Sequence, residues 1–331
     1  MKKTTILIIF SIITSLTGCF GETNTPRGDE KPPISFENDR NFVGSIIVET
    51  PGSPILDGVA VPFIYYEDEI FYLYMCNGTE GHHYSTSTDG LNFTSPLKTG
   101  IGGCGLNFVK LNNGSYRLYT TTKITLEDGT ESINSTSAVF SNLTNLGPSN
   151  RIIDNGTNAE AKGEPCNNFM GTPNAIRLNQ NDDSVRLYFS CSDPSHMASF
   201  TSLDGFNFGE SDGILLNQAI DIEVHFTLHV GHAGEKYRVF YTLFNPEDHP
   251  EISPFHPQEI MTAVSDDGLN WKVEGMIANV SSVSEKLGME INVLADPTAV
   301  QLSDNSWRIY FGSASEKTDD HGGIYSLRWT P

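Results

Sequence analysis

Five short aromatic stretches recur along the chain and decide its fold. They read Phe71-Tyr-Leu-Tyr74, Tyr116-Arg-Leu-Tyr119, Val185-Arg-Leu-Tyr188, Tyr237-Arg-Val-Phe240 and Trp307-Arg-Ile-Tyr310. Their alternation and their aromatic and β-branched content predict strands. Each stretch follows a polar turn, and a second apolar strand precedes that turn. Each repeat is therefore predicted to begin with a β-hairpin.

A second motif lies downstream of three of these hairpins. It reads Ser87-Thr-Asp-Gly-Leu-Asn-Phe93, Ser202-Leu-Asp-Gly-Phe-Asn-Phe208 and Ser265-Asp-Asp-Gly-Leu-Asn-Trp271, and a degenerate copy spans residues 141–146. Asp-Gly is a strong signal for a tight turn. We interpret these heptapeptides as structural turns between outer strands, not as active-site residues.

The spacing of the repeats predicts the architecture. The aromatic stretches are 45 to 70 residues apart, which leaves room for four short strands in each repeat. This pattern predicts an all-β fold, a five-bladed β-propeller of four-stranded antiparallel blades over residues 43–331. The last repeat holds only three strands, so we expect residues 43–48 to supply the fourth and close the ring. The only helix expected is a short one within residues 280–289.

The N-terminus has the features of an export signal. Residues 1–18 combine a basic start with a short apolar run, and they end in Leu16-Thr-Gly-Cys19. This ending resembles the bacterial lipobox, which implies cleavage before Cys19, acylation of its sulfur and a lipid anchor in the cell envelope, at the outer membrane or cell surface. An ordinary signal peptide with a chance cysteine is the alternative. Residues 19–42 are polar and proline-containing, which is typical of a flexible tether.

Four cysteines remain if Cys19 carries lipid. An exported protein occupies a compartment in which disulfides persist. Proximity along the chain favours the pairs Cys76–Cys104 and Cys166–Cys191. A metal site and free buried thiols are the alternatives, although no Cys-x-x-Cys motif is present.

The charge balance excludes some partners. The chain has 20 Lys and Arg against 41 Asp and Glu, a formal charge of −21. Sequence-independent nucleic-acid binding and a polybasic membrane footprint both need clustered basic residues, so neither is expected. We expect a monomer that contacts the membrane only through its lipid.

The hairpins and the Asp-Gly turns together resemble the five-bladed propeller superfamily of glycoside hydrolases, including families 43, 62, 32 and 130. The resemblance covers roughly residues 43–331 and implies carboxyl groups on the inner strands, where one group protonates the leaving oxygen and another activates water or attacks. Aligning each inner strand on its last apolar residue gives Asp57 as a base or nucleophile. Blades two, three and four place Gly105, Thr172 and Val224 there, so the family's full carboxyl set is not evident. The remaining candidates for the acid or its partner are Glu223, Asp296 and Glu164.

Other polar residues follow on the same strands. We consider them candidates for sugar binding, with mutual packing as the alternative; they are Asn107, Asn174, His225 and Thr298. Four strand arginines recur at equivalent positions, which indicates a structural role and not a substrate clamp; they are Arg117, Arg186, Arg238 and Arg308.

No cofactor is required by these motifs. Whether a metal binds at the propeller axis stays open at this point, and a structural Ca²⁺ is an alternative because oxygen ligands are abundant.

Two functions follow from these observations. The first is a surface-anchored carbohydrate-active protein that hydrolyses glycosidic bonds of an oligo- or polysaccharide at the propeller axis by carboxylate acid/base chemistry. The second is a non-catalytic propeller that binds glycan or protein and lacks the full carboxylate set. Two carboxyl groups converging in one site favour hydrolysis, whereas an aromatic channel mouth with a single carboxyl favours binding.

Overall fold

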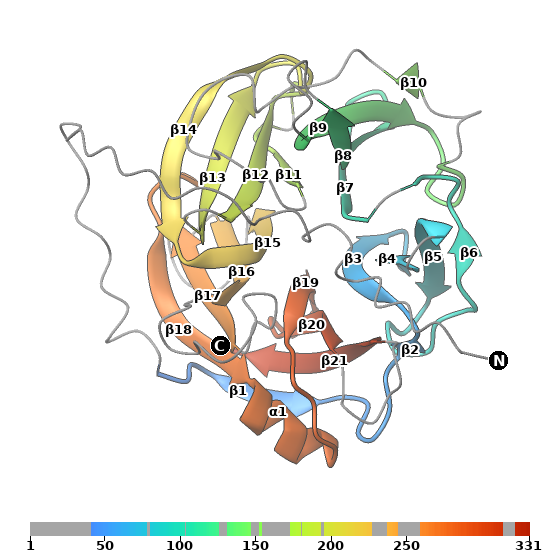
Figure 1. The fold of residues 1–331 in the computed structure, drawn as a ribbon, viewed down its shortest axis with the longest axis vertical. Helices are drawn as coiled ribbons and strands as arrows, with labels where there is room; N and C mark the ends of the chain where they lie inside the picture. The colour runs from blue at the N-terminus through green and yellow to red at the C-terminus, as the bar shows by residue number, and fades with distance from the viewer. Residues whose placement is uncertain are drawn as a thin grey trace.

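The computed structural model describes residues 41–77, 80–102, 104–125, 131–146, 152–153, 173–179, 181–192, 195–226, 237–243, 259–313 and 322–331. Its strands form five antiparallel sheets arranged radially around a centre (Figure 1). The predicted five-bladed β-propeller with four-stranded blades is therefore confirmed. Among the described residues, no helix is both long and apolar enough to cross a membrane.

Four blades are continuous in sequence. Blade 1 holds β3 (Ala60–Glu67), β4 (Ile70–Cys76), β5 (His82–Ser87) and β6 (Leu97–Lys98). Blade 2 holds β7 (Leu106–Lys110), β8 (Tyr116–Thr125), β9 (Glu131–Phe140) and β10 (Ile152–Ile153). Blade 3 holds β11 (Asn174–Arg177), β12 (Val185–Ser192), β13 (Ser195–Ser202) and β14 (Phe208–Asn217). Blade 4 holds β15 (Ala219–Phe226), β16 (Tyr237–Leu243), β17 (Glu259–Ser265) and β18 (Lys272–Asn279).

Blade 5 joins the two ends of the propeller. From the centre outwards, its first three strands are β19 (Ala295–Gln301), β20 (Trp307–Ser313) and β21 (Gly323–Thr330). The outer strand is β1 (Ser45–Val48), which pairs antiparallel with β21 and confirms the predicted closure by this segment. The short strand β2 (Leu56–Asp57) pairs with the other end of β21. The expected helix is α1 (Val280–Leu287), which is capped by Asn279 and ends at Gly288.

The core is divided among the blade interfaces. Five apolar clusters of buried side chains each join two neighbouring blades, and the cluster between blades 4 and 5 also takes up α1. Because each blade buries its faces only against its neighbours, the ring must close for every face to be covered.

The Asp-Gly heptapeptides connect neighbouring blades. In the turn of blade 1, Asp89 Oδ1 accepts from the backbone N–H groups of Leu91 and Asn92, both at 2.8 Å. The turn then presents the Gly90 carbonyl to Tyr310 Oη of blade 5 at 2.8 Å. Tyr119 and Tyr188 reach the turns of the next blades in the same way.

The degenerate turn of blade 2 is used in the same way, since Tyr74 Oη donates to the Leu143 carbonyl at 2.6 Å. Blade 4 has Phe240 at this motif position, and its neighbour, blade 5, has no such heptapeptide in the sequence. The last aromatic residue of the motif is therefore a tyrosine in each blade whose neighbour provides a turn carbonyl to accept from the hydroxyl.

The strand arginines extend this network. Arg186 Nη1 donates to the Asp267 carbonyl at 2.8 Å, and Arg308 Nη1 donates to the Asp89 carbonyl. Arg238 instead lies over the Trp329 ring, 5.1 Å from its centroid, and pairs with Glu274. These contacts agree with the structural role that their repetition indicates.

A disulfide joins Cys76 and Cys104, as predicted from their proximity along the chain. Cys191 is also disulfide-bonded, whereas Cys166 lies outside the described residues. Because the Cys76–Cys104 bridge closes a separation of 28 residues, its loss is expected to destabilise the fold by about 3–4 kcal/mol. The double substitution Cys76→Ser with Cys104→Ser should lower Tm by about 10 °C. An unchanged Tm in calorimetry would show that the bridge contributes nothing to stability.

Candidate functional site

The innermost strand of each blade pairs in the same register with the second strand of that blade. These inner strands are β3, β7, β11, β15 and β19, and their shared register defines levels along the central channel. The residues opposite the last aromatic residue of each repeated motif form one level. They are Phe63, Asn107, Asn174, Glu223 and Thr298. We call the four polar members, Asn107, Asn174, Glu223 and Thr298, the polar ring.

The polar ring connects neighbouring inner strands by hydrogen bonds. Asn107 Oδ1 accepts from Ala175 N at 3.1 Å, and Asn174 Oδ1 accepts from Val224 N at 2.9 Å. Thr298 Oγ1 accepts from Ile64 N at 3.1 Å. Each bond crosses from one blade to the next, so these side chains stabilise the ring of inner strands as well as lining the channel.

Glu223 is the charged member of the polar ring and is buried. Its Oε2 accepts from Asn174 Nδ2 at 2.7 Å, and Thr298 also hydrogen-bonds to it. Burial nevertheless raises the pKa of Glu223 to about 8, so the carboxyl is largely protonated at neutral pH. His225 Nε2 lies 3.8 Å from Glu223 Oε1. Burial, together with the charge of Arg238, lowers the pKa of His225 to about 3 and keeps its imidazole neutral.

The raised pKa of Glu223 makes stability depend on pH. The folded state holds this proton to about pH 8, whereas the unfolded chain releases it near its usual value of 4.5, so stability falls as pH rises between these values. Glu223→Gln removes the titration, and we expect its stability relative to the wild type to increase by about 3 kcal/mol between pH 5 and pH 8.

Urea unfolding at the two pH values measures this difference, with Glu210→Gln on the exposed part of β14 as the matched control. A difference between Glu223→Gln and the wild type that is the same at both pH values would contradict the assignment.

Two further carboxyl groups lie one level before the polar ring. Asp221 and Asp296 each come two residues before a ring member, at a β-bulge in β15 and β19. Both have left-handed backbone, with φ of 49°. Such strained non-glycine residues and bulges are enriched at functional sites. Asp296 N donates to Asp221 Oδ2 at 3.4 Å, which places the two residues side by side, and both keep some exposed surface.

The two carboxyls of this pair have unequal surroundings. Asp221 accepts from Thr242 Oγ1 at 2.9 Å and from Asp296 N, contacts that favour its ionised form. Burial raises the pKa of Asp221 despite them. The pKa of Asp296 lies well above its usual range, first because of burial and then because of the Asp221 charge. The two carboxyls therefore differ in how readily they hold a proton, with Asp296 favoured as the protonated member, and acid/base chemistry uses such a difference.

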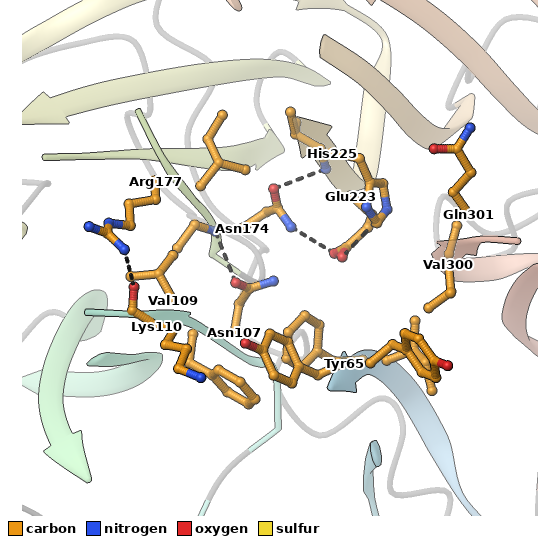
Figure 2. Close-up of a pocket in the computed structure, with 18 residues that line it drawn as sticks. Tyr65, Asn107, Val109, Lys110, Asn174, Arg177, Glu223, His225, Val300 and Gln301 are labelled. Carbon is orange, nitrogen blue, oxygen red and sulfur yellow. Dashed lines mark hydrogen bonds and ion pairs between the residues drawn. The ribbon is translucent and has the colours of Figure 1, made fainter. Parts of the chain in front are cut away.

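A cavity of about 460 Å³ lies on the other side of the polar ring (Figure 2). Its lining runs from the ring level towards the ends of the inner strands: 63–66, 107–110, 174–177, 223–225 and 299–301. Figure 2 shows Asn174 hydrogen-bonded to Glu223, and Asn107 bonded to the backbone of the strand that carries Asn174, with Tyr65 also lining the cavity. Glu223 is the only carboxyl among the lining residues described, so this cavity lacks an acid/base pair.

The structure corrects part of the predicted site. The prediction that Asp57 begins the first inner strand is wrong: Asp57 is exposed in β2 and pairs with Gly323 of β21. The equivalent inner-strand position is Val61, with a φ of 51°. The alignment failed because β3 ends in the polar Glu67, so its last apolar residue is not equivalent to that of the other inner strands.

Blade 4 was also misaligned. The sequence alignment placed Val224 where the structure has Asp221, and so missed one carboxyl of the pair. A usable signal was present, because Asp221-Ile-Glu223 has the same spacing as Asp296-Pro-Thr298.

The other candidates divide into two groups. Glu223 and three of the predicted binding residues, Asn107, Asn174 and His225, come together around the cavity, while Thr298 joins them through the polar ring. Asp296 lies one level away, and Glu164 and Thr172 fall outside the described residues.

Comparison with known proteins agrees with this fold. No model of a known protein family matches the chain, and no curated protein matches it in sequence. Among solved structures, the catalytic domain of a GH62 α-L-arabinofuranosidase from Coprinopsis cinerea is similar with a TM-score of 0.56 and 12% identity, covering 87% of this chain and 98% of that one. An endo-1,4-β-xylanase from Bacteroides thetaiotaomicron is similar with a TM-score of 0.55 and 13% identity, covering 84% and 91%.

A thermostable family-43 glycoside hydrolase gives a TM-score of 0.56 and 12% identity, covering 85% of this chain and 91% of that one. The five-bladed propeller of this chain is thus the fold of these glycoside hydrolases. At such low identity the likeness establishes the fold and leaves the chemistry to be argued from the site.

Proposed function

We propose that this protein hydrolyses glycosidic bonds at the Asp221–Asp296 pair. The observation that carries the proposal is the pairing itself: two adjacent carboxyls at equivalent bulges of neighbouring inner strands, with the pKa of one raised further by the charge of the other. The similarity of the fold to glycoside hydrolases supports carbohydrate as the substrate class.

The two carboxyls take different steps in this reaction. Asp296 donates its proton to the glycosidic oxygen as the bond from the anomeric carbon to that oxygen breaks. Asp221, ionised and held by Thr242, accepts a proton from water as the water oxygen forms the new bond to the anomeric carbon. Asp221 then releases its new proton to solvent and Asp296 takes up a proton from solvent, which restores the starting state.

A hydrolysis screen tests this function. The wild type should release reducing sugar from at least one member of a panel of arabinan, xylan, galactan and aryl glycosides. Asp296→Asn should reduce the rate by about 10²–10⁴-fold, because it removes the proton donor. Asp266→Asn, at an exposed turn residue, is the control and should keep full activity. Activity that survives in both Asp221→Asn and Asp296→Asn would overturn the assignment.

We also propose that the enzyme is held at the cell envelope by lipid on Cys19. The support is the sequence of residues 1–19, since these residues lie outside the structure's description. A Cys19→Ala chain expressed in a bacterial host should move from the membrane fraction to the soluble exported fraction. Retention in the membrane fraction would contradict the anchor.

A further inference from the structure

We infer that the cavity beyond the polar ring is a separate, non-catalytic binding site for a neutral saccharide. It lies on the opposite side of the ring from the Asp221–Asp296 pair, because its lining residues all stand at or after the ring level of their strands. The inference does not depend on hydrolysis at that pair.

Two residues that line this cavity have a polar atom without a hydrogen-bond partner among the described residues. Asn107 uses its Oδ1 to hold Ala175 N, which leaves its Nδ2 without a hydrogen bond to the described residues and directed into the cavity (Figure 2). His225 Nε2 likewise has no hydrogen-bond partner among the described residues, the nearest group being Glu223 Oε1 at 3.8 Å. Such groups lose free energy when they stay unpaired, so a ligand that bonds to them gains affinity.

Aromatic side chains also line the cavity. Tyr65 packs against the buried Phe108 with ring centroids 4.8 Å apart, and Tyr66 is 48% exposed. Apolar ring faces beside a few fixed polar groups suit a sugar, which presents C–H groups on its faces and hydroxyls at its edges. The volume of about 460 Å³ falls in the range of small-molecule sites and accommodates a mono- or disaccharide.

The charges at the cavity favour a neutral ligand. Lys110 is paired with Glu67. Arg177 Nη1 donates to the Lys110 carbonyl at 3.1 Å, and its Nε donates to the Asp182 carbonyl at 3.1 Å. Both cations at the cavity are therefore already engaged, so the described lining residues offer no free positive charge to hold an anionic ligand.

Calorimetric titration of the full chain with xylobiose and cellobiose tests the inference. The chain carries Asp296→Asn, so that hydrolysis does not consume the probe. We expect saturable binding of at least one disaccharide. His225→Phe keeps the aromatic contacts with Trp307 and Phe240 and removes Nε2, and it should weaken binding about tenfold.

Asn107→Asp keeps the oxygen that accepts from Ala175 N but removes the Nδ2 donor, and it should weaken binding to a similar extent. Asn113→Asp is the matched control: it makes the same charge change at an exposed turn residue whose Oδ1 accepts from Ser115 N, and should leave Kd unchanged.

Two results would overturn the inference: no saturation by either disaccharide, or Kd values that His225→Phe and Asn107→Asp leave unchanged. If a variant fails to fold, the NMR signals of the His225 ring in the Asp296→Asn chain give the same answer. They must shift with probe concentration for the site to stand. Neither overturning result bears on hydrolysis at Asp221 and Asp296, which the activity screen tests by itself.

Discussion

Replacing Asp221 by asparagine is expected to move the alkaline limb of the pH–rate profile towards lower pH by about one unit or more. Asp296 must be protonated to act as the acid, and its pKa is raised partly by the negative charge of Asp221. The asparagine side chain carries no charge, so Asp296 loses its proton at a lower pH in this variant. The same substitution removes the base, and we expect kcat to fall by about 10²–10⁴-fold.

The pH profile separates this mechanism from a merely structural role for Asp221. Because stability falls as pH rises, a variant that is only less stable would lose folded protein at high pH, which circular dichroism across the pH range detects. Loss of the Asp221 charge instead shifts the limb while the protein stays folded. Residual activity on an aryl glycoside, measured from pH 4 to pH 9 for the wild type and Asp221→Asn, gives the two profiles. An unmoved alkaline limb would rule out Asp296 as an acid tuned by Asp221.

Asp296→Asn should have a complementary dependence on the leaving group. A dinitrophenyl glycoside releases a stable anion that needs no proton, so this substrate should lose much less rate than an unactivated disaccharide. Equal losses on both substrates would instead assign Asp296 to the attack on the anomeric carbon. Thermal unfolding of the variant provides the control for correct folding.

The architecture could be predicted because short sequence patterns that repeat in the blades, the aromatic strand motif and the Asp-Gly turn, determine it. The aromatic motif gave all five blades, and the single incomplete repeat indicated that residues 43–48 close the ring. The repetition of the strand arginines also indicated a structural role, which agrees with the turn contacts of Arg186 and Arg308 and with the packing of Arg238 on Trp329. These features depend on strand periodicity and turn chemistry, which act over a few residues.

The catalytic candidates were harder to predict because their equivalence depends on β-bulges. Between Ile220 and Glu223, and between Ala295 and Thr298, the pairing slips, and no composition signal marks the slip. Counting back from the last apolar residue succeeded for Asp296 and failed for Asp221, because the apolar residues of blade 4 continue in the sequence to Val230, past the end of β15 at Phe226. The side-by-side placement of Asp221 and Asp296, 75 residues apart in sequence, is a property of neighbouring blades that no local pattern contains.

Replacing Glu49 by glutamine is expected to destabilise the propeller by about 3–5 kcal/mol. Glu49 directly follows the closing strand β1, and its carboxylate binds the Arg308 guanidinium in a bidentate manner, with Nε–Oε2 of 2.7 Å and Nη2–Oε1 of 2.8 Å. Ser326 Oγ donates to the same carboxylate at 2.8 Å. Both side chains of the ion pair are about 90% buried, so removal of the negative charge leaves the Arg308 charge uncompensated inside the protein.

The effect should exceed that of an ordinary ion pair because Arg308 joins three parts of the ring. Its guanidinium also donates to the Asp89 carbonyl of blade 1, so this one side chain holds the closing segment, blade 5 and the first Asp-Gly turn together. Asp304→Asn, in the exposed pair with Arg328, is the matched control and should cost less than about 1 kcal/mol. Denaturant unfolding measures both variants. Equal small losses would show that the ring is closed by the backbone pairing of β1 with β21 and by apolar packing, with no contribution from the buried charges.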